Sequence, residues 1–216
     1  MPAEVTGDAL NFPFKEASHQ RESALFGMWI FLATEVLFFG GMFAAYSIYR
    51  FSHGQAFHEA AHHQEWYLGF LNTLVLLTSG FTMALAVECA RKGEWTWLLR
   101  LFAVTWILGA SFLAIEGFEY HAKFVEHLVP GTGFQFTGSD PGASELFFCL
   151  YFTMTGMHMF HMVIGLVLIL CFGMWARFSS YAGANRNCFE VLGLYWAFVD
   201  IVWLFLYPLF YLVNPS

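Results

Sequence analysis

The chain contains few charged residues. Of its 216 residues, only 12% are Asp, Glu, Lys or Arg, whereas about a quarter are charged in an ordinary soluble domain. Hydrophobic residues make up 58%, and phenylalanine alone occurs 27 times. A water-soluble fold would have to expose more Phe and Trp than a soluble surface tolerates. The composition therefore indicates an integral membrane protein, because runs of about 20 apolar residues are typical of transmembrane helices.

Other missing features narrow the class of protein further. No C-x-x-C pair occurs, so the four scattered cysteines predict neither a disulfide framework nor a zinc site. The sequence has no Walker loop, no Gly-rich nucleotide fingerprint and no nucleophile elbow, and we expect no catalytic centre and no nucleic-acid partner. The first 22 residues lack the apolar core of a cleavable signal peptide, so the first apolar segment is expected to act as an uncleaved insertion signal. The cysteines are Cys89, Cys149, Cys171 and Cys188.

Five long apolar segments are present instead. They lie at about 25–50, 66–91, 95–118, 144–176 and 188–213. None alternates apolar and polar residues as the strands of a membrane β-barrel do, and in lipid only helices or closed barrels satisfy the backbone. The sequence thus predicts an all-α, polytopic bundle of five transmembrane helices, forming one membrane domain over 1–216 after a polar tail at 1–24. Ser139 or Asp140 can cap the fourth helix, and Pro141 suits its first turn.

The basic residues predict how the bundle is oriented. The N-terminal tail and the second and fourth loops lie on one side and carry seven of the nine basic residues, while the first and third loops carry two. Because cytoplasmic loops are enriched in Lys and Arg, we expect a cytoplasmic N-terminus and a C-terminus outside. The seven are Lys15, Arg21, Arg91, Lys92, Arg100, Arg177 and Arg186.

A few polar side chains fall inside the apolar segments. Glu35 in the first helix and Asp200 in the fifth lie roughly 15–18 Å from the inner end, at about 1.5 Å per residue, and His158 and His161 in the fourth helix fall near the same depth. Ionisable groups at mid-bilayer are costly and face the bundle interior with a partner. We therefore predict a buried polar network of these four residues, with the pairs left open. Asn72 is expected to donate an interhelical hydrogen bond.

The two histidines allow three interpretations: metal ligands, part of a proton or lipid-linked site, or structural polar groups. An H-x-x-H pair with two carboxylates can suit iron or zinc. However, no acidic residue lies three positions before His158 or His161, so the E-x-x-H pattern of di-iron bundles is absent. We favour the structural network and expect no metal in this chain. Glu116 and Glu119 lie near the predicted outer boundary, where we expect water to solvate them.

Several segments together resemble subunit III of the haem-copper oxidases. They occur in that family's order and cover every predicted helix, and the chain is similar to the short five-helix bacterial form. The segments are "GMWIFLATEVLFFGG" (27–41), "LNTLVLLTSGFT" (71–82), "GASFLAIEGFEY" (109–120), "FFCLYFTMTGMHMFHMVIG" (147–165) and "LYWAFVDIVWLFLYPLFY" (194–211).

The resemblance implies an accessory subunit of a terminal oxidase, most often cytochrome c oxidase, in a bacterial cytoplasmic membrane. Such a subunit carries no haem or copper, which reside in partner subunits. It packs on subunit I in a complex that includes subunit II, binds phospholipid in a cleft, and supports proton uptake and sustained turnover.

Individual positions carry the resemblance. Glu35 corresponds to the family's carbodiimide-reactive glutamate, and the T-G-x-H-x-x-H element supplies the two histidines. Asp200 ends an element usually written Y-W-H-F-V-D, but this chain has Ala197 where the family usually has His. Position 116 is also unusual, since Glu116 stands where Gln or Lys is common.

Two other readings remain. Quinol oxidases and nitric oxide reductases have related subunits, so the electron donor is open. A stand-alone membrane transporter belongs to a different class; transporters often show inverted repeats and helices interrupted by Gly or Pro. The sequence shows no internal repeat, and Pro208 is the one proline inside an apolar segment.

Overall fold

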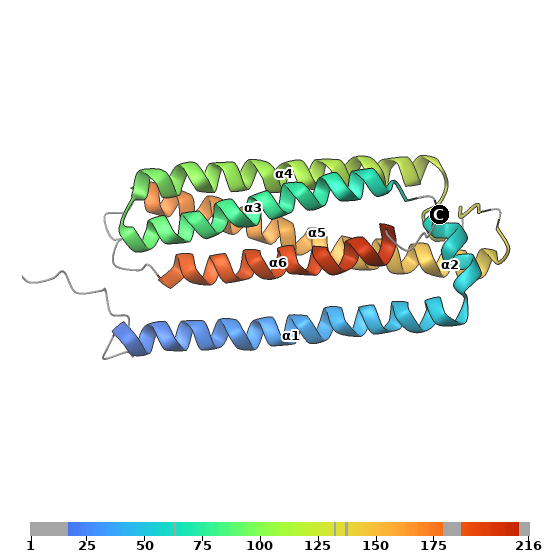
Figure 1. Ribbon diagram of the computed structural model, residues 1–216, viewed down its shortest axis with the longest axis horizontal. Helices are drawn as coiled ribbons and strands as arrows, with labels where there is room; N and C mark the ends of the chain where they lie inside the picture. Colours follow the sequence, from blue (N-terminus) through green and yellow to red (C-terminus); the bar gives the residue numbers. More distant parts are fainter. Residues whose placement is uncertain (1–16, 63, 132, 137, 179–186, 212–216) are drawn as a thin grey trace, which may run out of the picture.

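A computed structural model describes residues 17–62, 64–131, 133–136, 138–178 and 187–211, and within these ranges the regular structure is helical without any strand. Five of the helices are long and apolar enough to cross a membrane, which confirms the predicted all-α, five-helix class. The helices in these ranges are α1 (Ala17–Ser52), α2 (Gly54–Ala61), α3 (Trp66–Lys92), α4 (Trp95–Val125), α5 (Pro141–Phe178) and α6 (Asn187–Tyr211) (Figure 1).

Two helix boundaries differ clearly from the predicted ones, and one short helix lies where the sequence predicted a loop. The first helix begins at Ala17, so the expected polar tail at 1–24 is partly helical. The α4 helix continues to Val125, well beyond residue 118, and the short α2 lies in a segment predicted as a surface loop. In α1 and α4 polar residues lower the local hydropathy near these ends, yet they do not break the helix. Residues 1–16 of the tail and 212–213 of the last predicted helix lie outside the described residues.

Local sequence signals account for two of the helix ends. Asp140 caps α5, because its Oδ1 accepts hydrogen bonds from the backbone N–H groups of Gly142 and Ala143, each at 3.1 Å. The turn from α3 to α4 passes through Gly93, whose φ of 78° is left-handed. Its N–H donates to the carbonyl of Ala90, and the next N–H donates to Cys89, which is the way glycine commonly ends a helix.

The helices α3, α4, α5 and α6 pack together, whereas α1 lies along one side of this group (Figure 1). The short α2 lies at one end of the bundle, hereafter the α2 end, between the end of α1 and the start of α3. The side chain of Phe57 on α2 is fully buried and packs edge-on against Phe147 of α5, with 5.4 Å between ring centroids. This contact closes the α2 end of the core.

The two parts of the bundle bury different amounts of surface. The core between α3, α4, α5 and α6 contains large, fully buried side chains such as Trp196 and Trp203. The buried side chains that the structure describes on α1 form one stripe at helical spacing. They are Met28, Leu32, Phe39 and Tyr46. The other faces of α1 are exposed and apolar, as expected for a helix that meets lipid or a partner protein.

Candidate functional site

Glu35 and His161 form the contact that links α1 to α5. The Nε2 atom of His161 lies 3.2 Å from Glu35 Oε2, and the side chains are 9% and 18% exposed. The other ring nitrogen, Nδ1, lies 2.8 Å from the carbonyl oxygen of Met157, one turn earlier on α5. Because that carbonyl can only accept, Nδ1 is the donor.

His158 has a different environment, although it lies only three residues away. It is fully buried between two aromatic rings: Trp203, stacked at 5.3 Å, and Phe112, edge-on at 5.5 Å. Neither ring nitrogen has a hydrogen-bond partner among the described residues. His158 thus fills an aromatic core position.

Asp200 faces α3. Its carboxyl group lies so close to Gly80 that a Cβ atom at that position would collide with it, and Oδ1 has no hydrogen-bond partner within the described ranges. On either side of it, α6 reaches α3 through two indole N–H groups. Trp196 donates to Ser79 at 3.0 Å, and Trp203 donates to Thr73 at 3.1 Å.

The four residues predicted to form one network are therefore distributed over three environments. The structure pairs Glu35 with His161, surrounds His158 with aromatic rings, and turns Asp200 toward α3. Similar depth in the membrane does not determine the direction in which a side chain points around its helix. Whether these residues serve packing, lipid binding or proton uptake stays a prediction.

A second polar cluster lies nearer the α2 end of the core, with Glu119 at its centre. The Nζ atom of Lys123 lies 2.6 Å from Glu119 Oε1. Two tyrosine hydroxyls donate to the same carboxylate: Tyr151 at 3.0 Å, and Tyr211 at 2.8 and 2.9 Å to its two oxygens. Glu119 and Lys123 are 3% and 2% exposed. This carboxylate therefore ties α4 to α5 and α6.

Asn72 joins this cluster from α3. Its Nδ2 donates to Oε1 of Glu116 at 3.0 Å, and both side chains are fully buried. The expectation that Glu116 and Glu119 are solvated was wrong, because α4 runs beyond the predicted boundary and keeps both carboxyls inside the bundle. The four-residue spacing of Glu119 and Lys123 was the sequence signal for this ion pair.

An apolar groove separates α1 from α6. It has a volume of about 410 Å³, and Figure 1 shows α1 standing apart from α6 along this side. Ala197 lies on its wall, facing α1 and away from the buried polar groups. The lining residues are Trp29, Leu32, Val36, Phe39, Gly40, Phe43, Leu194, Ala197, Phe198, Ile201, Val202 and Phe205.

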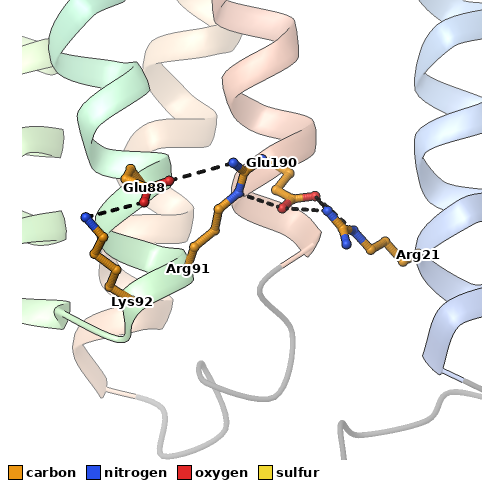
Figure 2. Close-up of polar contacts among 5 residues, drawn as sticks. All are labelled: Arg21, Glu88, Arg91, Lys92 and Glu190. Atoms are coloured by element: carbon orange, nitrogen blue, oxygen red, sulfur yellow. Dashed lines mark hydrogen bonds and ion pairs between the residues drawn. The ribbon is translucent and has the colours of Figure 1, made fainter.

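An ionic cluster fastens α1 at the end opposite α2 (Figure 2). Glu190, on the first turn of α6, accepts three hydrogen bonds of 2.8–3.1 Å from the Arg21 guanidinium of α1. It also pairs with Arg91 of α3 at 3.0 Å. Glu88 pairs with Lys92 at 3.4 Å and with Arg91 at 3.7 Å. The same carboxylate of Glu190 thus connects three helices.

The polar clusters differ from a metal centre. Within the part of the chain that the structure describes, no three His, Cys, Asp or Glu side chains come together in an arrangement that could hold a metal ion. What the arrangement offers is an apolar groove, a buried carboxyl–imidazole pair beside it, and hydrogen-bonded clusters that fix the surrounding helices.

Comparisons with known proteins assign the chain to a family. The model of the family described as cytochrome c oxidase subunit III matches residues 15–214. A probable cytochrome c oxidase subunit 3 of Nocardia farcinica is 31% identical over 87% of each chain, and the cytochrome c oxidase subunit 3 of Thermostichus vulcanus is 30% identical over 87% of this chain and 86% of that one. The cytochrome bo(3) ubiquinol oxidase subunit 3 of Pseudomonas aeruginosa is 31% identical over 89% of this chain and 86% of its own length. The chain therefore belongs to the cytochrome c oxidase subunit III family of the haem-copper oxidases.

Proposed function

We propose that this chain is the accessory subunit III of a terminal oxidase in aerobic respiratory electron transport, within a bacterial cytoplasmic membrane. It packs directly on subunit I, in a complex that also contains subunit II, and these partners carry the haem and copper that reduce oxygen. The observation that carries the proposal is the family match across residues 15–214. The five candidate membrane helices agree with it.

The charges support an orientation with the N-terminus in the cytoplasm and the C-terminus outside. Arg21, Arg91, Lys92, Arg100 and Arg177 all belong to helix ends opposite the α2 end. Because basic residues are enriched on the cytoplasmic side, this end faces the cytoplasm and the α2 end faces outward.

The groove between α1 and α6 supports a role in binding phospholipid. Its wall is made of hydrocarbon and aromatic side chains, which suit an acyl chain, and the indole N–H of Trp29 is the one side-chain hydrogen-bond donor among the lining residues. The pair of Glu35 and His161 lies beside it, since Leu32 and Val36 of the same helix line the groove. We assign to this pair the family's link to proton uptake and sustained turnover.

The first and second candidate functions differ in the type of oxidase or reductase complex to which the chain belongs. Relatives of nearly equal identity include cytochrome c oxidase subunits and a ubiquinol oxidase subunit. A place in a cytochrome c oxidase is the leading assignment because most of the similar relatives bear that name. A place in a quinol oxidase or nitric oxide reductase is the alternative.

Purification of the intact complex through a tag on this chain tests the assignment. The expected result in mild detergent is co-purification of a haem-bearing subunit I, with a reduced-minus-oxidised haem spectrum and a subunit II identified by mass spectrometry. A subunit II with a CuA centre establishes the cytochrome c oxidase, whereas one without it establishes the alternative. A colourless chain that purifies alone would contradict both and favour a stand-alone transporter.

A pair of neighbouring glycines tests the role of the groove. Gly40 lines the groove and Gly41 is not among its lining residues, and a Cβ atom at either position would meet nothing within 4 Å. Gly40→Phe should fill the groove, reduce the phospholipid that co-purifies with the complex and shorten the period of turnover. Gly41→Phe is the matched control. Equal lipid content and equal turnover in the two variants would contradict lipid binding in this groove.

A further inference from the structure

Glu116 carries an oxygen that no donor satisfies. Its side chain is fully buried in the half of the core nearer the α2 end, and Oε1 accepts the hydrogen bond of Asn72 Nδ2 at 3.0 Å. The second oxygen, Oε2, has no hydrogen-bond partner among the described residues, and the same holds for the amide oxygen Oδ1 of Asn72. The side chains of Glu116 and Asn72 are thus joined by one hydrogen bond, and each keeps one buried acceptor oxygen without a donor.

The cation in this cluster is already engaged. Lys123 lies 2.6 Å from Glu119, and Glu119 also accepts hydrogen bonds from Tyr151 and Tyr211. Glu116 lies three residues before Glu119 on the same face of α4, where side chains are neighbours. Two ionised carboxylates beside one ammonium would leave a buried negative charge without a partner, which is strongly unfavourable in an apolar interior.

The groups around Glu116 come from all four helices of this core. Asn72 approaches from α3, Glu119, Tyr120 and Lys123 lie on α4, Tyr151 on α5 and Tyr211 on α6. The tyrosine hydroxyls already have acceptors: Tyr120 pairs with Thr155 at 2.6 Å, and the other two donate to Glu119. None of these groups, Lys123 included, donates to Glu116 Oε2, so among them a donor can come only from the carboxyl group itself.

We propose that Glu116 is a proton-binding site, occupied at neutral pH, in which the protonated carboxyl and the Asn72 amide form a reciprocal pair. In this pair the amide N–H donates to Oε1, and the proton bound at Oε2 donates to the amide oxygen Oδ1. One bound proton satisfies both leftover acceptors and leaves the cluster with the single balanced ion pair of Glu119 and Lys123. The site goes beyond the proposed function and does not depend on which electron donor the complex uses.

Two chemically different glutamates thus lie one helical turn apart. Glu119 is a carboxylate that accepts hydrogen bonds from the ammonium of Lys123 and from two tyrosine hydroxyls. Glu116 is a neutral acid that both accepts and donates. Replacement of Glu116 by Gln should be tolerated, since a Gln amide can form the same two hydrogen bonds with Asn72. Replacement of Glu119 by Gln should not be, because it removes the charge that Lys123 requires.

Infrared difference spectroscopy of the intact purified complex at neutral pH tests the proposal. The carbonyl stretch of a protonated carboxyl is separated from those of carboxylates and amides, and the wild-type-minus-Glu116→Gln spectrum should contain one such band. Glu59→Gln is the matched control, because Glu59 lies near the surface and accepts hydrogen bonds from Ser139, so its replacement should remove a carboxylate signal. Loss of a carboxylate signal in Glu116→Gln would overturn the proposal.

A second variant keeps the test decisive if Glu116→Gln does not assemble. Asn72→Val removes the partner amide while Glu116 stays in place. The protonated-carboxyl band should then shift to higher frequency, because the acid loses its hydrogen bond to Oδ1. A spectrum with no protonated-carboxyl band affected by either substitution would mean that Glu116 is ionised and that the reciprocal pair does not exist.

Discussion

Replacement of Glu119 by Gln offers a sharp test of the buried cluster. The change preserves the shape of the side chain but removes its charge, so the ammonium of Lys123, only 2% exposed, is left without its partner at 2.6 Å. Breaking a buried ion pair by removing one partner costs roughly 3–5 kcal/mol. The two tyrosine hydroxyls keep the Gln carbonyl as an acceptor, so weakening of their bonds adds about 1 kcal/mol or less. We expect Glu119→Gln to lower the free energy of unfolding by several kcal/mol.

The companion change is the double variant Glu119→Gln with Lys123→Met. Replacing both members of a buried ion pair is often close to neutral, because no unpaired charge remains in the interior. The double variant should therefore recover most of the stability that the single variant loses. Glu88→Gln serves as an exposed control: Glu88 pairs with Lys92 and Arg91 at the protein surface, and such pairs contribute about 0–1 kcal/mol.

The assay is equilibrium unfolding of the purified chain in mixed micelles, followed by tryptophan fluorescence as the fraction of denaturing detergent is raised. From most to least stable, we expect the order wild type, Glu88→Gln, the double variant and Glu119→Gln. Two results would refute it. One is a Glu119→Gln variant as stable as the Glu88→Gln control. The other is a double variant as unstable as Glu119→Gln alone, which would mean that the lysine does not carry the penalty.

Three further changes test other parts of the structure. Gly165→Ala should destabilise the bundle by about 1–3 kcal/mol, because the added Cβ would lie 2.8 Å from the buried indole ring of Trp196. Gly41→Ala should not, because the space around its Cβ is open. Thermal unfolding of the two variants measures the difference. Glu190→Gln should cost about 1 kcal/mol or less, since the arginines it pairs with are half exposed, and it should make cross-linking between α1 and α6 less sensitive to added salt than in the wild type. The backbone N–H of Ser139 donates to Glu59 and holds the pKa of that carboxyl group below its ordinary value. The contact is therefore fully present above the ordinary pKa and is lost as the pH falls through the lowered pKa. Below that pH, the protection of the Ser139 amide from hydrogen exchange should be equal in wild type and Glu59→Gln.

The fold could be predicted because it depends on long apolar runs. All five predicted transmembrane segments are helices in the structure, since lipid leaves a continuous apolar run little choice but a helix. The ends were harder. Polar residues near Ala17 and Val125 lowered the hydropathy before the helices ended, and hydropathy reports the thickness of the hydrocarbon layer, whereas a helix continues until its backbone is capped or broken.

The sequence predicts which residues share a face of one helix more readily than it predicts which helices contact each other. Helical spacing puts Gly193, Trp196, Asp200, Trp203 and Tyr207 on one face of α6, and in the structure this whole face packs on α3. The sequence could not show that α3 lies opposite it, because the order of helices around a bundle does not follow their order along the chain. To choose the pairs within the predicted network of Glu35, His158, His161 and Asp200 would have required that information.

The missed ion pair has a more specific cause. Glu119 was expected near the outer boundary and Lys123 in the loop that follows, because the third apolar segment was predicted to end at about residue 118. Had α4 been extended by two turns, their four-residue spacing would have placed them on one face as a favourable pair, with Glu116 next to them. An oppositely charged pair at the end of an apolar run can therefore belong to a helix that continues with the pair facing the bundle interior. It does not always mark the point where the helix enters water.

Ala197 shows how a departure from the family's sequence is read differently once the fold is known. From the sequence, an alanine in "YWAFVD" suggested a weakened polar network around Asp200. In the structure Ala197 is exposed on the wall of the groove, whereas the carboxyl group of Asp200 lies against Gly80 of α3. A histidine at this position would place two ring nitrogens against α1, in a groove otherwise lined by hydrocarbon and aromatic side chains. The alanine therefore adds no hydrogen-bonding group to this wall, where the indole N–H of Trp29 is the one side-chain donor among the lining residues.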